Sequence, residues 1–337
     1  MSKRKKYNVF LKLFIKFSGS LECGAIVGVI FFLILFTVFT NGLWLSVMNI
    51  QVIMRSAAQL GIMAIGQALM LITGKFDLSV GSIFGICGVS FVAMTRVMDV
   101  PFAFILALLL GAGIGFMNGF FTEKMRVPSL VTTLGSLYIF RGLVYFITQG
   151  FANTIPKTAR DTALVRLLGG TFMGGWNNSI IWFILISITM SILLFFTPYG
   201  NWLFAVGNDE RSTLSRGVSP VKVRMIAFLT CGLLAGFSGI ITVCDMKIGG
   251  TTLGSGMELE SIASSVIGGI SLSGGLGSIF GAAMGAVFLS MIRSGLIMLG
   301  APPYWFVTFV GVTLIGAILF NIKMRKRFQK IIEKEKE

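Results

Sequence analysis

The chain has 337 residues, of which 55% are hydrophobic and only 12% are charged, and its mean hydropathy is +0.89. This composition excludes a soluble globular protein and indicates a membrane protein with many spans. The formal net charge is +15, but the basic residues are dispersed along the flanks of apolar segments, so we do not expect a nucleic-acid partner.

Ten apolar segments follow one another along the chain. A helix needs about 20 apolar residues to cross the hydrocarbon core of a bilayer, and the alternation typical of barrel strands is absent from the sequence. We therefore predict an all-α polytopic membrane protein with about ten transmembrane helices. The predicted spans are residues 24–41, 49–73, 79–96, 101–121, 128–149, 179–197, 223–244, 258–273, 277–299 and 304–321. The first should anchor the chain instead of being cleaved, and the eighth, short and rich in glycine, should be broken or re-entrant.

An even number of spans places both ends of the chain on one side of the membrane, where most of the 28 lysines and arginines lie. The positive-inside rule predicts that this side is cytoplasmic. The expected organisation is a basic cytoplasmic tail at 1–23, a transmembrane domain at 24–321 and a second basic cytoplasmic tail at 322–337. The transmembrane domain should carry an external loop at 150–178 and a cytoplasmic loop at 199–224.

Two glycine-rich joints at the predicted edges of the membrane combine a flexible backbone with small hydroxyl groups. One is Gly74–Gly81, after the second span, and the other is Gly268–Gly275, after the eighth. We expect Asp77 to hold the first joint, either by capping the next helix near Ser79 or by pairing with Lys75.

Glycines recur at every fourth residue in several spans, for example Gly111, Gly115 and Gly119, or Gly232 and Gly236. This spacing places them on one face of a helix, where two backbones can approach closely. We expect close packing there, and smooth faces that can slide would also serve an alternating-access machine.

Polar residues inside spans usually face a cavity or a partner. For Arg141 and Arg293, the sequence fits a structural ion pair or carbonyl clamp as well as a role in a transport pathway. The amides and hydroxyls suit a neutral, hydroxyl-rich solute better than an ion, because no ring of carboxylates is present, although hydrogen bonds between helices would also explain each of them. The expected pathway residues are Asn118, Thr132, Thr133, Ser136, Ser264 and Ser265.

A polar stretch from Tyr199 to Arg224 interrupts the apolar spans. It predicts a short surface helix from Asp209 to Ser215, a stop at Gly217 and a restart at Ser219–Pro220. We interpret it as a coupling element that docks a cytoplasmic partner. Its expected contact residues are Asp209, Glu210, Arg211, Ser212, Thr213 and Gly217.

The sequence offers few groups for chemistry. It has no histidine and no pair of carboxylates in a catalytic arrangement, and Gly74–Lys75 is not followed by the serine or threonine of a P-loop. Cys23, Cys87, Cys231 and Cys244 sit in or beside apolar spans without metal-like spacing and should be packing residues. We predict no catalytic residue, metal or cofactor, so the chain is not an enzyme and its energy source is a separate protein.

Three motifs resemble those of a known family, the permease subunits of bacterial ABC importers for simple sugars such as ribose, xylose, arabinose and galactose. Gly74–Gly81 is similar to the family's G-x-x-D-L-S-V-G. Val127–Gly135, followed by Arg141–Gly142, is similar to its V-P-x-F-I-x-T-L-G followed by R-G. Gly254–Gly275 is similar to its G-x-G-x-E-L-x-x-I-A-x-x-V-x-G-G-x-S-L-x-G-G. The resemblance covers the chain in order from roughly residue 45 to residue 321.

The resemblance implies a permease domain at 24–321 with the ten-helix fold of vitamin B12 importers, the type II importers, in the bacterial inner membrane. It implies transport of a simple sugar, or a related polyol or furanose signal, delivered by an external or periplasmic sugar-binding protein. It further implies two cytoplasmic ABC ATPase subunits, a second permease copy in a homodimer or heterodimer, and a coupling helix within Ala205–Val218.

The chain departs from the family pattern at Ser212–Thr213, where a pair of alanines is common, and at Lys75, where an apolar residue or glycine is usual. A structural protein or a channel would not account for the coupling loop. The more serious alternative is a secondary transporter of a small neutral solute, which uptake on a proton or sodium gradient without ATP would favour.

The residues we assign to structural joints are Asp77, Ser79, Gly81, Arg141, Glu258, Gly274 and Gly275.

Overall fold

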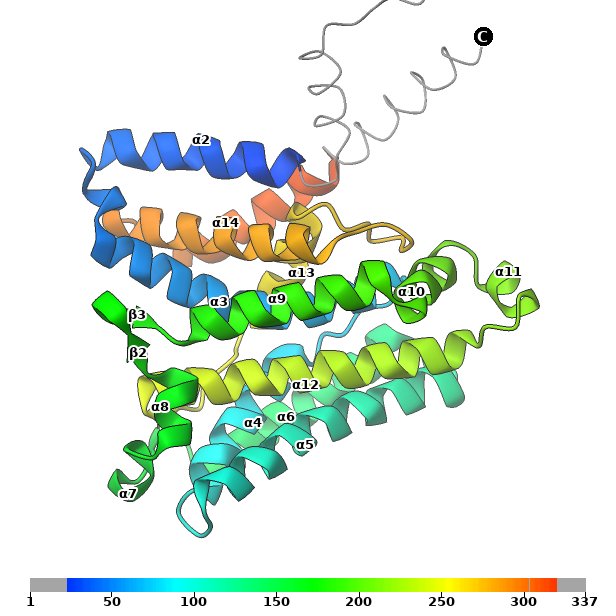
Figure 1. Cartoon of the computed structure of the whole chain (residues 1–337), viewed down its shortest axis with the longest axis horizontal. Helices are drawn as coiled ribbons and strands as arrows, with labels where there is room; N and C mark the ends of the chain where they lie inside the picture. The colour runs from blue at the N-terminus through cyan, green and yellow to red at the C-terminus, as the bar shows by residue number, and fades with distance from the viewer. Residues whose placement is uncertain (1–22, 303, 320–337) are drawn as a thin grey trace, which may run out of the picture.

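The computed structural model describes residues 23–302 and 304–319. The predicted basic tails lie outside the described residues, apart from the main chain of Cys23. In the described part, long helices run side by side and strands occur only as two short pairs (Figure 1). The chain is therefore an all-α polytopic membrane protein, as the sequence predicts.

Each predicted span coincides with a helix. These helices are α2 (Cys23–Phe39), α3 (Val47–Ile72), α4 (Val80–Met94), α5 (Val100–Gly119) with the π-helical turn η2 (Phe120–Lys124), α6 (Ser129–Thr148), α9 (Ser179–Phe196), α12 (Pro220–Met246), α13 (Met257–Ile267), α14 (Ile279–Met298) and a last helix at Tyr304–Leu319. Proline stands in the first turn of α5 and α12, where its fixed φ favours a helix start.

Six of these helices are long and apolar enough to cross a membrane, namely α3, α5 with η2, α6, α9, α12 and α14. The helices α2, α4 and Tyr304–Leu319 are apolar but shorter. Helix α13 has only 11 residues, which is about 16 Å of helix and less than the hydrocarbon core is thick. The count of ten spans and the arrangement of vitamin B12 importers therefore stay predictions.

The centre of the bundle consists of α3, α12 and α14, whose most apolar windows are 72–78% buried, and α4 packs against α12. Helices α5, α6 and α9 lie outside this centre. Helices α5 and α12 meet through glycines: a Cβ atom on Gly115 would collide with the Phe228 carbonyl oxygen, and one on Gly232 with the Gly111 carbonyl oxygen. The expected close packing at these glycines is confirmed.

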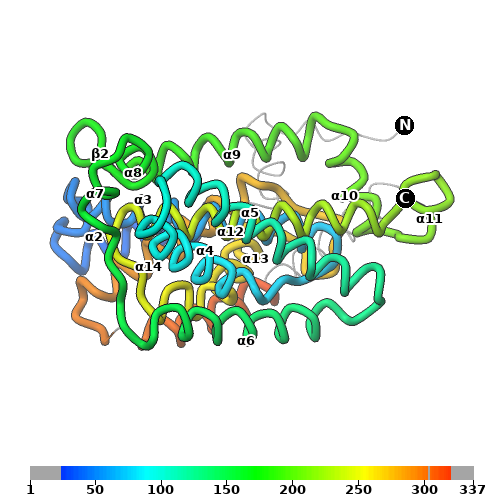
Figure 2. The backbone as a smooth tube through the Cα atoms, turned by 90° about the horizontal axis from the view of Figure 1, so that it is seen from below, coloured from blue at the N-terminus to red at the C-terminus, as the bar shows by residue number. Residues whose placement is uncertain are grey.

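Short elements cover the two ends of the bundle, which Figure 2 shows on opposite sides. One end, which we call the strand end, carries η1 (Leu43–Leu45), β1 (Asn153–Thr154), α7 (Lys157–Arg160), α8 (Ala163–Gly169), β2 (Thr171–Phe172), η3 (Met173–Gly175), β3 (Trp176–Asn177) and β4 (Ile248–Gly249). Strand β1 pairs antiparallel with β4, and β2 with β3. The other end, which we call the coupling end, carries α10 (Pro198–Asn208) and α11 (Glu210–Ser215).

The segment 250–256 enters the bundle before α13 begins. It runs along α4, so that a Cβ atom on Gly81 would collide with the Gly254 carbonyl oxygen and the Glu258 carboxylate. The structure thus brings together Gly81 and Glu258, two predicted joint residues. Helix α13 starts inside the bundle and runs toward the coupling end beside α14.

Helix α13 ends at Ile267, although the predicted span extends to residue 273. Glycine explains the early stop: Gly268 packs against the Gly281 carbonyl group, and Gly269 has a φ of +94°, a conformation that favours glycine. The helix is therefore shorter than the predicted span, a broken or re-entrant element stays a prediction, and the following loop reaches the coupling end.

Candidate functional site

The coupling end contains the loop predicted to dock a partner. Helix α11 begins after Asp209, whose Oδ1 accepts hydrogen bonds from the main-chain NH groups of Arg211 and Ser212 at 3.0 and 3.1 Å. Gly217 ends this turn with a φ of +82°, and the Ser219 side chain caps α12. The short helix, its stop and the restart therefore lie where the sequence predicts them.

Helix α11 exposes most of its surface. The exposed predicted contact residues are Asp209, Glu210, Arg211 and Gly217. Ser212 is half-buried, whereas Thr213 is buried and donates a hydrogen bond to the Asp209 carbonyl oxygen at 2.6 Å. The apolar Leu214 is 62% exposed on the same helix. The tip of α11 thus presents charged groups around an apolar side chain, while Thr213 holds the helix together.

The two glycine-rich joints meet under α10. The main-chain NH of Gly275 donates to the Ile72 carbonyl oxygen at 2.8 Å, and the side-chain amide of Asn208 donates to the Gly275 carbonyl oxygen at 3.3 Å. A Cβ atom on Gly207 would collide with the Ile72 carbonyl oxygen, so α10 rests directly on the end of α3. Gly274, with a φ of +82°, packs beside them. The coupling loop and both joints therefore form one junction.

Asp77 lies fully buried in the joint between α3 and α4. Its Oδ1 accepts hydrogen bonds from the main-chain NH and the hydroxyl of Ser79 at 2.8 and 2.6 Å, and Asn118 on α5 donates to the Ser79 hydroxyl at 2.8 Å. Burial raises the pKa of the Asp77 carboxyl group, and the hydrogen bonds from Ser79 oppose this rise. These bonds support the capping alternative, and no ion pair joins Asp77 to Lys75 in the described part of the chain.

A buried arginine connects the coupling loop to two helices. Nη1 of Arg224, on the first turns of α12, lies 2.9 Å from Glu210 Oε2 on α11 and 3.5 Å from Glu123 Oε2 in η2. The side chains of Arg224 and Glu123 are only 8% and 5% exposed, whereas that of Glu210 is 55% exposed. Among the described residues, this is the only ion pair that joins α11 to the helix bundle.

Three of the predicted pathway residues are buried among packed helices. Asn118 bonds to Ser79, as described above. On α13, the Ser264 hydroxyl donates to the Ala282 carbonyl oxygen at 2.9 Å and the Ser265 hydroxyl to the Ala64 carbonyl oxygen at 3.1 Å. These contacts tie α13 to α14 and α3, and the assignment of these residues to a pathway stays a proposal.

The other three predicted pathway residues lie on α6, most of whose surface is exposed. Thr133 is buried and donates to the Ser129 carbonyl oxygen at 2.8 Å. The hydroxyls of Thr132 and Ser136 have no hydrogen-bond partner among the described residues. Both hydroxyls are buried, so another molecule could bind them only if the surrounding side chains moved.

Arg141 and Arg293, for which the sequence left a structural or a pathway role open, both make structural contacts. Arg141 Nη1 on α6 donates to the Leu253 carbonyl oxygen at 2.7 Å and clamps the segment 250–256. Arg293 Nη2 on α14 donates to Glu260 Oε1 on α13 at 2.6 Å. Arg293 also lines a cavity, so it can have a role in a transport pathway as well as in the ion pair.

This cavity has a volume of about 470 Å³ and lies between α3, α12, α14 and the segment leading into α13. Its size is typical of small-molecule pockets, about 300–1,000 Å³. The polar residues in its wall include Gln59, Thr242, Ser255, Glu260, Ser290 and Arg293. None of them coincides with a predicted pathway residue.

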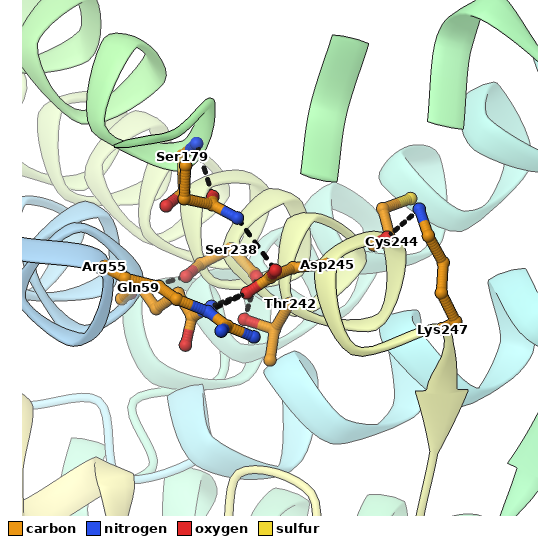
Figure 3. Close-up of polar contacts among 9 residues, drawn as sticks. Arg55, Gln59, Ser179, Ser238, Thr242, Cys244, Asp245 and Lys247 are labelled. Atoms are coloured by element: carbon orange, nitrogen blue, oxygen red, sulfur yellow. Dashed lines mark hydrogen bonds and ion pairs between the residues drawn. The ribbon is translucent and has the colours of Figure 1, made fainter. Parts of the chain in front are cut away.

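A carboxylate network lies next to the cavity, toward the strand end. Figure 3 shows Arg55 and Gln59 of α3 reaching Asp245 of α12. Asp245 Oδ2 accepts from Arg55 Nε and, at 3.0 Å, from Gln59 Nε2, while its Oδ1 accepts from Asn177 Nδ2 of β3 at 2.8 Å. Asp245 thus fastens the segment 150–178 to two central helices.

Asp245, Glu123 and Glu260 are site residues that no sequence motif singles out. Each is a carboxylate within or at the end of an apolar span, which is a signal for a buried partner or a cavity. The partner itself is distant in the sequence, since Arg55 precedes Asp245 by 190 positions. The local sequence therefore identifies a carboxylate such as Asp245 as unusual, but it does not identify the residue that pairs with it.

A known protein family and individual known proteins match this chain over most of its length. The family described as "Branched-chain amino acid transport system / permease component" matches residues 49–318. The Autoinducer 2 import system permease protein LsrC of Photorhabdus luminescens is 33% identical over 291 residues, which cover 86% of each chain. The protein of the same name from Salmonella typhi is 32% identical over 296 residues, covering 87% of this chain and 83% of the relative. No solved structure matches the chain significantly.

Proposed function

The chain belongs to the family of permease components described as "Branched-chain amino acid transport system / permease component", and we propose that it is the membrane-spanning subunit of an ATP-driven ABC importer for a small sugar-like solute. The family membership makes it a transport permease of the ABC importer class. ATP as the energy source, the cargo and the partners are the proposed part.

The observation that carries the proposal is the junction at the coupling end. Helix α10 contacts the end of α3 and the second glycine-rich joint through Gly207 and Asn208, and the loop containing Gly275 connects α13 to α14. A partner that moves α10 and α11 would displace the end of α3 and the start of α14 together with α13. A cytoplasmic ABC ATPase subunit that docks on α11 would supply this movement.

The proposed orientation follows the positive charges. Arg211, Arg216 and Lys222 lie in or beside the coupling loop, which favours a cytoplasmic coupling end, with both termini on the same side. The strand end, with the segment 150–178, then faces outward. We propose that an extracellular or periplasmic sugar-binding protein docks there, because the network around Asp245 would pass a movement of this segment to α3 and α12.

The cargo is proposed from the relatives and from the polar groups of the chain. The relatives carry the name of the autoinducer 2 import system, and the resemblance of the motifs extends to pentose and hexose importers. We therefore propose a furanose-like signal or a simple sugar. A second permease copy would pack on the exposed face of α6, where Cβ atoms on Gly135 and Gly142 would meet no neighbour and another chain could approach closely.

Two amides on α10 allow a matched test. Asn208 bonds to Gly275, whereas Asn201 is exposed and makes no hydrogen bond to the described residues. In a complex with the ATPase, Asn208→Ala should lower substrate-stimulated ATP hydrolysis by removing a link of about 0.5–1.5 kcal/mol, while Asn201→Ala should behave as wild type. Equal activity of both variants would count against coupling through Asn208, and uptake that follows an ion gradient without ATP would favour a secondary transporter.

A further inference from the structure

The cavity beside Asp245 has the composition of a binding site for a neutral solute. Its two charged residues, Glu260 and Arg293, form an ion pair at 2.6 Å and so balance each other. An ionic ligand that paired with one of these groups would compete with their ion pair and leave the other group, Glu260 at 13% exposure or Arg293 at 39%, without its partner. A neutral ligand would leave the pair in place.

The same pair can still bind polar groups. Glu260 lines the cavity, and its Oε2 is buried without a hydrogen-bond partner among the described residues, while the Arg293 side chain is 39% exposed. A carboxylate accepts hydrogen bonds from two neighbouring hydroxyls, and a guanidinium has five N–H donors in a fixed geometry. A solute with two adjacent hydroxyl groups matches this combination of acceptors and donors.

The rest of the wall fits a ring with polar edges and apolar faces. The guanidinium carbon of Arg293 lies 4.1 Å from the centre of the Phe306 ring, which fixes the arginine and forms part of the wall. Phe84 and Leu289 line other parts of the cavity, and Ser255 and Ser290 add hydroxyls. Apolar surface with a few placed polar groups is typical of small-molecule sites.

We propose that this cavity is a transient binding site for the cargo and that it recognises a neutral vicinal diol through Glu260 and Arg293. The proposal rests on the importer function and adds the site and the chemistry of recognition. The cavity is partly open, so we expect a low affinity that lets the cargo leave it. Tight binding belongs to the external binding protein.

A thiol-protection experiment tests the site directly in the full-length chain. Ser255 is exposed in the cavity wall, and Ser46 is exposed at the same end but outside the cavity. In membranes, Ser255→Cys and Ser46→Cys are labelled with a small membrane-impermeant methanethiosulfonate reagent, with Cys23 replaced by serine in both. The probes are ribose and autoinducer 2, with ribose 5-phosphate as a charged counterpart.

At about ten times its dissociation constant, a bound probe should slow labelling at Ser255→Cys about tenfold. Labelling at Ser46→Cys should not change, and Glu260→Gln should remove the protection. Ribose 5-phosphate should protect less than ribose. The proposal is overturned if neither neutral probe protects Ser255→Cys, if Ser46→Cys is protected equally, if Glu260→Gln has no effect, or if the phosphate protects as well as ribose.

Uptake separates this result from the importer function itself. Ser290 lines the cavity, whereas Ser294 lies one turn further along α14 and bonds to Asn49. Ser290→Phe should block ATP-driven uptake while the ATPase still co-purifies, and Ser294→Ala should transport normally. Normal ATP-driven uptake by Ser290→Phe would remove the binding site but keep the importer, whereas wild-type protein without ATP-driven uptake would remove the importer function.

Discussion

Replacing Arg224 with methionine should destabilise the protein far more than removing its exposed partner Glu210. Methionine keeps much of the side-chain volume but leaves the Glu123 carboxylate, 5% exposed, buried without its cation. Breaking a buried ion pair from one side costs about 3–5 kcal/mol. At about 2 °C per kcal/mol for a chain of this size, the melting temperature in detergent should fall by about 6–10 °C.

Two further variants test this reasoning. Glu210 is 55% exposed, so Glu210→Gln should cost at most about 1 kcal/mol. Adding Glu123→Met to Arg224→Met removes the buried charge and should recover most of the lost stability. Thermal unfolding followed by intrinsic fluorescence measures all three. A melting temperature of Arg224→Met equal to that of Glu210→Gln, or no recovery in the double variant, would refute the buried ion pair.

Three other substitutions test the joints and the route. Gly217 has a φ of +82°, so Gly217→Val should strain the end of α11 and lower ATPase stimulation in the complex, and unchanged stimulation would count against docking there. Asp77→Ala removes both hydrogen bonds to Ser79 and should cost about 1 kcal/mol; a wild-type melting temperature and normal uptake would contradict its role in the joint. Ser136→Trp on α6 should block uptake while the complex stays assembled, and normal uptake would place the route elsewhere.

The sequence predicts the local elements of this fold well, because each depends on neighbouring residues. Apolar length defines the helices, Asp209 and Ser219 mark helix starts, and Gly217 marks a stop. The glycines at 268 and 269 end α13 earlier than apolar length predicts, because backbone packing and a positive φ override hydropathy there.

The assembly of the site depends on contacts that local patterns do not contain. Nothing near Arg55 in the sequence indicates Asp245 as its partner, and the glycine-rich joints give no sign that they meet at Gly74 and Gly274. The cavity is a similar case: Glu260 lies in a family-like motif, but the cavity wall comes from six separate helices and the loops beside them. These features follow from tertiary packing and not from propensity or spacing.

Uptake by the reconstituted complex tests the central claim most directly. The permease, its ATPase and the external binding protein are placed in proteoliposomes, and entry of radiolabelled ribose or autoinducer 2 is measured with ATP supplied on the coupling-loop side. We predict uptake that requires ATP and the binding protein and persists when ion gradients are collapsed. Uptake that continues without ATP and stops when a proton or sodium gradient is removed would contradict the account.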